Sequence, residues 1–134
     1  MILNDFTMLG KSVPEPTLSD GLTWVCSVGV SPSYGGLLRI YPLSIRNAPK
    51  RWDTYRVAVE RDSRDWRKDS YRVDCDRDVY PYEVNQQFDR VGKMSRTQRI
   101  DVLNRFVVGS VSEANEKRLS LAVIQPEFLE VYIK

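Results

Sequence analysis

The stretch TWVCSVGVSPSYGGLLRIYPL, residues 23–43, decides the fold class. Two runs rich in β-branched and apolar residues, 23–30 and 37–43, flank the segment SPSYGG, where a proline and paired glycines favour a turn. The pattern predicts a β-hairpin. We expect its second strand to stop at Pro42, since proline cannot donate to a strand ladder.

Arg39 lies in the middle of that second strand, flanked by apolar neighbours. A buried guanidinium needs a partner, so one interpretation is a structural ion pair. The carboxylates available for it are Glu60, Asp65 and Asp69. The other interpretation is that Arg39, Arg67 and Tyr71 line one anion-binding surface. The sequence leaves both open.

Strands are also expected elsewhere. Residues 54–61, TYRVAVER, alternate between apolar and polar residues and predict a half-buried antiparallel strand. Residues 119–134 predict two further strands bent at Pro126. The turn-rich residues within 1–22 suggest an irregular lead-in. We expect a single domain over 1–134, a usual size for one hydrophobic core.

One convincing helix is predicted over 95–107, with Ser95 as N-cap and an apolar face of Ile100, Leu103, Phe106 and Val107. Residues 83–91 suggest a shorter helix before it. Strands, then one or two helices, then strands with short connections indicate a mainly β, α+β fold. The simplest version is a small OB-like antiparallel β-barrel with one or two helices, one of them plugging an end.

Composition narrows the class of protein. No run approaches the roughly 20 apolar residues that cross a bilayer, and the N-terminus lacks the pattern of a secretory signal, so we expect a cytoplasmic protein. Cys26 and Cys75 fit no zinc spacing and are expected to be reduced thiols. Histidine is absent, which removes the usual general base and metal ligand. We expect no cofactor.

The acidic group DCDRD, with Asp74, Asp76 and Asp78, has the alternating carboxylates that could hold Mg²⁺ or Ca²⁺. Such cages need more oxygen ligands than this spacing guarantees, and Arg77 intrudes. We therefore expect a solvated edge and no metal site. The wider segment 46–78 carries both charges densely, as solvated loops and edge strands do.

The basic residues suggest a binding role. The net charge is only +2, but arginine outnumbers lysine, and arginine makes bidentate contacts to phosphate. Aromatic residues interleave with arginine in RWDTYR and DWRKDSYR, where Trp52 and Trp66 suit either a core or a binding role. The residues expected to bind a ligand are Arg39, Tyr41, Arg46, Arg51, Trp52, Arg67 and Tyr71.

The segments WVCSVGV, LLRIYPL, DWRKDSYRV and LSLAVIQPEFLEVYI together resemble an uncharacterised prokaryotic and phage family. Members carry V-C-T-A-G, W-I-R-L-Y-P, D-x-R-x-E-S-Y and S-L-G-I-I-K-P segments in this order. Leu37 replaces a tryptophan of the pattern, Val28 an alanine and Asp69 a glutamate. More distantly, the family is similar to dual OB-fold domains of bacterial conflict systems. The resemblance implies a β-barrel that handles nucleic acid or nucleotides.

Three functional hypotheses follow. The first is a non-enzymatic module that binds nucleic acid or a nucleotide through an arginine and aromatic face, with affinity that falls steeply as salt is added. The second is a small phage-encoded protein that binds and inhibits a host defence protein, because Arg, Trp and Tyr also form interface hot spots. The third is an enzyme with Asp65 or Asp69 as general base, which the lack of histidine disfavours.

Overall fold

The computed structural model describes residues 1–12, 15–16, 23–75, 83–119 and 121–124. The chain divides into two compact units, residues 1–95 and residues 96–134. The prediction of a single domain over the whole chain stays a prediction. In the described residues, no helix is both long and apolar enough to cross a membrane.

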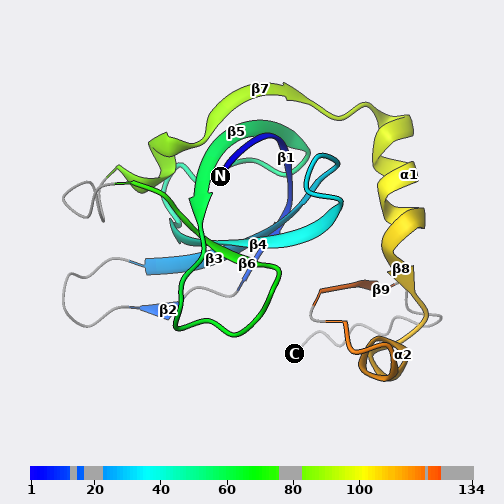
Figure 1. Ribbon diagram of the computed structural model, residues 1–134. Helices are drawn as coiled ribbons and strands as arrows, with labels where there is room; N and C mark the ends of the chain where they lie inside the picture. The colour runs from blue at the N-terminus through cyan, green and yellow to red at the C-terminus, as the bar shows by residue number, and fades with distance from the viewer. Residues whose placement is uncertain (13–14, 17–22, 76–82, 120, 125–134) are drawn as a thin grey trace, which may run out of the picture. The chain divides into compact units, whose positions relative to one another are not determined.

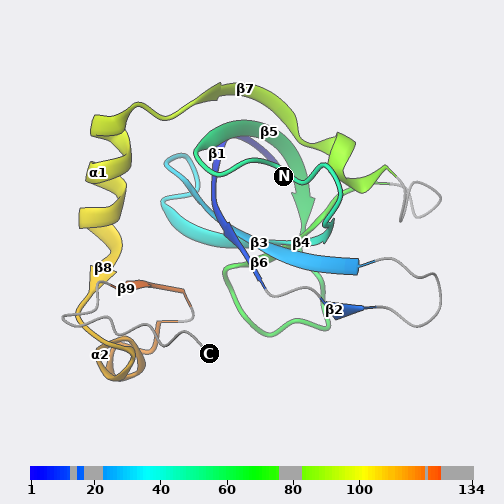
Figure 2. The same ribbon diagram turned by 180° about the vertical axis from the view of Figure 1, so that it is seen from behind.

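The first unit is a closed five-stranded β-barrel (Figures 1 and 2). Its elements are β1 (Ile2–Lys11), β2 (Glu15–Pro16), β3 (Thr23–Ser31), β4 (Gly36–Ser44), β5 (Asp53–Glu60), β6 (Ser70–Val73), the 3-10 turn η2 (Val84–Gln87) and β7 (Asp89–Lys93). The strands follow the order β1-β3-β4-β6-β5, and β5 pairs again with β1 to close the barrel. The neighbouring strands are antiparallel except β4 and β6, which are parallel. The predicted small OB-like barrel is confirmed.

The N-terminal prediction was wrong, because β1 replaces much of the expected irregular lead-in. Leu3, Phe6 and Met8 are buried in the barrel core, but bulges interrupt the pairing of β1 with β3 and with β5. These bulges break the strict alternation that identifies a strand in sequence. β1 curves across the barrel between its two partners (Figure 1), so it forms one of the five walls.

The predicted hairpin and the strand near 54–61 are confirmed as β3, β4 and β5. Their inward residues form the core with those of β1 and β6. The core consists of Leu3, Phe6, Met8, Val25, Leu38, Ile40, Leu43, Tyr55, Val57, Val59, Val73, Val84 and Phe88. Val84 and Phe88 come from η2 and the residue after it, so this short turn supplies the packing that we expected from a helix.

The shorter helix predicted over 83–91 is therefore wrong beyond its first turn. Residues 89–93 instead form β7, which pairs antiparallel with the first half of β5 and places Gly92 opposite Thr54. Gly92 has a low helix propensity, and pairing with β5 gives this segment backbone hydrogen bonds as an extended strand. Phe88 is held between β strands by edge-on and tilted contacts with Tyr55 and Phe6.

β4 does not stop at Pro42, as we predicted, but continues to Ser44. Between the pairs Val25–Leu43 and Ser27–Ile40, the single residue Cys26 of β3 lies opposite two residues of β4. Pro42 is one of these two and so occupies a bulge, where its missing N–H costs no ladder bond. The peptide bond that precedes it is cis.

The second unit contains α1 (Arg96–Phe106), β8 (Val107–Val108), α2 (Val111–Glu116) and β9 (Val123–Ile124). The helix predicted over 95–107 is confirmed as α1, but its apolar face is not buried in the described residues, where Ile100 is 49% exposed. β8 and β9 form a short parallel pair. The predicted bend at Pro126 and most of the predicted final strands lie outside the described residues.

A candidate ligand-binding groove

An open groove lies over the outer face of β3 and β4, beneath the loop that joins β5 to β6. We call residues 61–69 the charged loop. The groove has a volume of about 610 Å³ and is lined by Cys26, Tyr41, Asp62, Arg64, Asp65, Trp66 and Arg67. At the β4 bulge Cys26 lies opposite Tyr41 and Pro42, and bulges commonly redirect a side chain. Tyr41 and Cys26 both line the groove together with residues of the charged loop. In OB-type barrels this face and this loop carry ligands.

The charged loop is built from one unit used twice, Asp-x-Arg. Asp62 accepts from the backbone N–H of Arg64 at 3.0 Å, and Asp65 accepts from that of Arg67 at 3.0 Å. The two oxygens of each carboxylate also accept from Nε and Nη2 of the same arginine, with the Asp65–Arg67 contacts at 3.0 and 2.8 Å. Aspartate turns therefore fix the backbone and the arginine side chains together.

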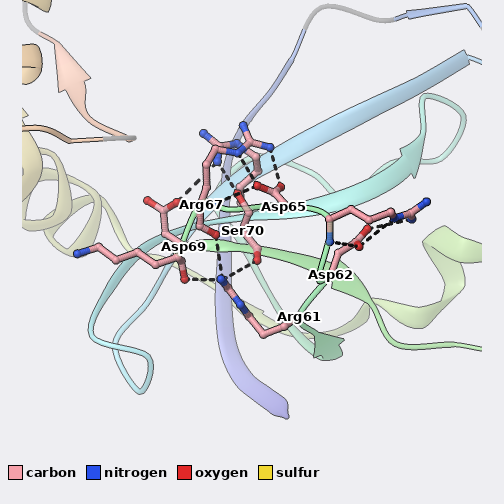
Figure 3. A network of polar contacts seen from close by, with 9 residues as sticks. Arg61, Asp62, Asp65, Arg67, Asp69 and Ser70 are labelled. Carbon is pink, nitrogen blue, oxygen red and sulfur yellow. Dashed lines mark hydrogen bonds and ion pairs between the residues drawn. The ribbon is translucent and has the colours of Figure 1, made fainter.

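Arg61 holds the far end of this loop. One of its terminal nitrogens, Nη1, donates to the carbonyl oxygens of Arg67, Lys68 and Ser70 at 3.0, 2.6 and 3.0 Å. Its guanidinium also lies 5.2 Å from the ring centre of Tyr71. Figure 3 shows Arg61 on one side of the loop and the Asp65–Arg67 pair on the other. The loop is thus fixed from both sides.

Trp66 stands at the centre of this fixed loop with 88% of its surface exposed. Its neighbours on either side, Asp65 and Arg67, face each other and form the rim of the groove. A large aromatic side chain on a loop held by several hydrogen bonds suits stacking. This residue is the least explained by folding in the described barrel.

The electrostatics of the groove are tightly coupled. The hydrogen bonds from Arg67 hold the pKa of Asp65 well below its usual range, so this carboxylate stays ionised. Burial, followed by the negative charges of Asp65 and Asp62, raises the pKa of Tyr41, so its phenol stays protonated. The hydroxyl oxygen of Tyr41 is itself buried, although the residue lines the groove. The pKa values of Asp62, Asp65 and Tyr41 all move away from neutral pH.

Arg39 forms the structural ion pair that we considered first. Its Nη1 donates to the Ser70 hydroxyl at 2.6 Å and lies 3.7 Å from the Asp69 carboxylate. The Arg39 and Asp69 side chains are only 12% and 17% exposed, and the Arg39 backbone N–H donates to the Asp69 carbonyl at 2.8 Å. The pair therefore joins β4 to the end of the charged loop.

The predicted site residues do not form one surface. Tyr41 and Arg67 line the groove. Tyr71 packs edge-on against Tyr34, with ring centres 5.7 Å apart, and against the core. The remaining three residues, Arg46, Arg51 and Trp52, lie in or beside the connection between β4 and β5.

Sequence reasoning did not include Cys26, Asp62 or Arg64 in the site, and it weighed Trp66 without choosing it. The signal that could have found the loop was the immediate repeat of Asp-x-Arg, in DSR and DWR. The signal for Cys26 lay only in strand pairing, because the bulge that places it opposite Tyr41 is a tertiary feature.

The chain belongs to the family described as Domain of unknown function (DUF8758), which matches residues 4–104. The match spans the barrel, including the groove and the charged loop, and most of α1. No curated protein and no solved structure matches the chain.

Proposed function

We propose that the barrel is a non-enzymatic module that binds single-stranded nucleic acid or a nucleotide in the groove, with an unpaired base stacked on Trp66. The observation that carries this proposal is the 88% exposed indole, fixed on a rigid loop above the strand face that OB-type barrels use. Tyr41 also lines the groove and adds a second aromatic side chain to it.

The paired charges suggest that the groove selects bases more than phosphates. Both arginines that line the groove face a carboxylate, in the pairs Arg64–Asp62 and Arg67–Asp65. The formal charge of these four side chains sums to zero. Arg64, with 78% of its side chain exposed, and Arg67, with 34%, can still reach a phosphate. We therefore revise the steep salt dependence expected from sequence to a shallow one.

The test is a fluorescence-anisotropy titration with short labelled single strands of RNA and DNA. Stacking on one aromatic side chain is worth about 1–3 kcal/mol per base, so Trp66→Ala should weaken binding by roughly 5- to 150-fold. Trp66→Phe keeps a ring and should recover part of the affinity. Both variants should fold normally, since the side chain is exposed. Equal affinities for wild type and Trp66→Ala would refute the proposal.

A second readout does not depend on changing Trp66. Cys26 lines the groove, so a bound strand should slow alkylation of its thiol. The experiment uses a Cys75→Ser variant, which leaves Cys26 as the reacting group. Protection that saturates together with the anisotropy signal supports binding in the groove. An unchanged alkylation rate at saturating nucleic acid would place the ligand elsewhere.

Binding to a protein is the second candidate, favoured by the same neutral groove and exposed tryptophan. Such a surface suits a phage-encoded inhibitor of a host defence protein, because tryptophan is enriched among interface hot spots. A stoichiometric complex with such a protein, formed without nucleic acid and lost in Trp66→Ala, would select it. Failure of every oligonucleotide to bind would remove the first candidate.

A further inference from the structure

A second hollow lies beside β5 and β7, and its lining shares no residue with the groove. It has a volume of about 520 Å³, in the range of small-molecule sites. We call it the basic pocket, lined by Asn47, Ala48, Pro49, Lys50, Asp53, Tyr55, Asn85, Phe88, Arg90 and Lys93. Three of these side chains are cationic and one is anionic.

The charge of the basic pocket is unbalanced, unlike that of the groove. Arg90 pairs with Asp53 at 3.1 Å, which accounts for the one carboxylate. Among the described residues, neither Lys50 nor Lys93 forms an ion pair, and both are exposed at the rim. The two ammonium groups, which the Asp53 carboxylate does not balance, favour an anion.

The wall of the basic pocket is fixed in advance. Asn85 donates to the carbonyl oxygens of Ser44 and Arg46 at 2.7 and 2.6 Å and accepts from the Ser44 N–H at 3.1 Å. The Tyr55 hydroxyl, on a side chain in the core, accepts from the Lys50 N–H at 2.8 Å. The connection that carries Lys50 therefore has little freedom left to lose on binding.

The same connection holds two residues in the left-handed region, Asn47 at φ 53° and Trp52 at φ 71°. For a bulky side chain such as Trp52 this conformation is strained. Backbone bonds enforce it, from the Trp52 N–H to the Met8 carbonyl at 2.7 Å and from the Met94 N–H to the Trp52 carbonyl at 2.9 Å. Strain kept in place by two neighbouring strands is typical of binding loops.

We propose that the basic pocket binds a phosphate group, held by Lys50 and Lys93 above the floor of Tyr55 and Phe88. Lysine binds phosphate as a compact point charge with several donors. Arg46 and Arg51, exposed in the same connection, extend the positive surface around it. The phosphate comes either from a free monoester or from the backbone of a strand, and both present the same anionic oxygens. This site is independent of the proposed groove function.

The test is an amide-shift titration of the full chain, followed at Gly92 and Lys93, with inorganic phosphate and pyrophosphate at constant ionic strength. Saturable shifts at these positions are expected. Loss of two charge-assisted contacts in Lys50→Gln/Lys93→Gln should weaken phosphate binding by at least about tenfold. The matched control Lys11→Gln/Lys68→Gln removes two exposed lysines outside the pocket and should bind like wild type. Equal affinity in both double variants would overturn the proposal.

Two further titrations identify the source of the phosphate. A short RNA without a terminal phosphate should shift Gly92 and Lys93 if the ligand is a strand backbone, and a nucleoside monophosphate alone should do so if it is a free monoester. No shift with any of these probes would overturn the proposal. Trp66→Ala separates the two sites, because it should leave phosphate binding unchanged whether or not the groove binds nucleic acid.

Discussion

Arg61→Ala tests whether the charged loop is held in place by one side chain. In the folded barrel, Nη1 of Arg61 contacts three carbonyl oxygens of the segment that returns the chain to β6. The other donors to these carbonyls are more distant: the Tyr34 hydroxyl lies 3.4 Å from the Lys68 oxygen, and the Ser70 N–H lies 3.3 Å from the Arg67 oxygen. Removing the guanidinium should therefore both destabilise the barrel and loosen the loop that carries Trp66.

The size of the effect follows from the donor count. Nη1 carries two hydrogens, so at most two of the three contacts are full hydrogen bonds. A bond from a charged donor contributes about 1.5–3 kcal/mol, which we reduce to about 1 kcal/mol each because Arg61 is exposed to water. The contact with the Tyr71 ring adds about 0.5 kcal/mol. Arg61→Ala should lower the free energy of unfolding by about 2.5 kcal/mol.

The assay is urea unfolding, followed through amide signals of β4 and β6. Arg56→Ala is the matched control, because Arg56 is an exposed arginine of β5, the strand that precedes Arg61, but makes one neutral contact, to Asn4 at 3.2 Å. Its effect should stay within about 0.5 kcal/mol. Arg61→Lys keeps the charge but not the planar group and should recover only part of the loss. Equal free energies of unfolding for Arg61→Ala and Arg56→Ala would refute the claim that Arg61 holds the charged loop in place.

Three more outcomes are expected. The pKa of Asp65 is lowered by folding from a reference of 3.8, so its stabilising effect is full above that pH and is lost on acidification; urea unfolding of wild type and Asp65→Asn should converge as pH falls. With about two phosphate contacts, affinity for a single strand should fall only about sevenfold between about 50 and 200 mM salt, and a loss above about a hundredfold in the anisotropy titration would contradict the neutral groove. A Cβ at Gly29 would collide with the Phe6 ring and the Thr7 carbonyl, so Gly29→Ala should strongly lower the urea concentration at the unfolding midpoint. Gly92→Ala is the control and should leave the midpoint unchanged, because a Cβ at Gly92 would meet open space. Equal midpoints for the two variants would show that β1 does not pack on β3 at Gly29.

The barrel could be predicted from sequence where alternation is regular. β3, β4 and β5 have clear patterns, and the turn residues between β3 and β4 fix their pairing. β1 was missed because its bulges shift the register, and a shift of one residue exchanges the inward and outward faces. The prediction that β4 stops at Pro42 was wrong, because the bulge that accommodates this proline depends on the pairing of β4 with β3.

The site could be predicted only in part, since its residues come from separate strands and one loop. Tyr41 and Arg67 were expected, and the choice for Arg39 between an ion pair and a ligand contact needed the position of Asp69. The exposure of Trp66 could not be read from sequence, because a tryptophan amid charged residues suits a core as well as a surface. Tertiary structure made that distinction.

The most direct test of the central claim is photo-crosslinking of the protein to a short RNA that carries 5-iodouridine, with the attachment site mapped by mass spectrometry. The iodinated base reacts with an aromatic side chain on which it stacks. We predict attachment at Trp66, with less at Tyr41, and loss of the product in Trp66→Ala. Attachment only at residues outside the groove, or none at concentrations that saturate binding, would contradict the account.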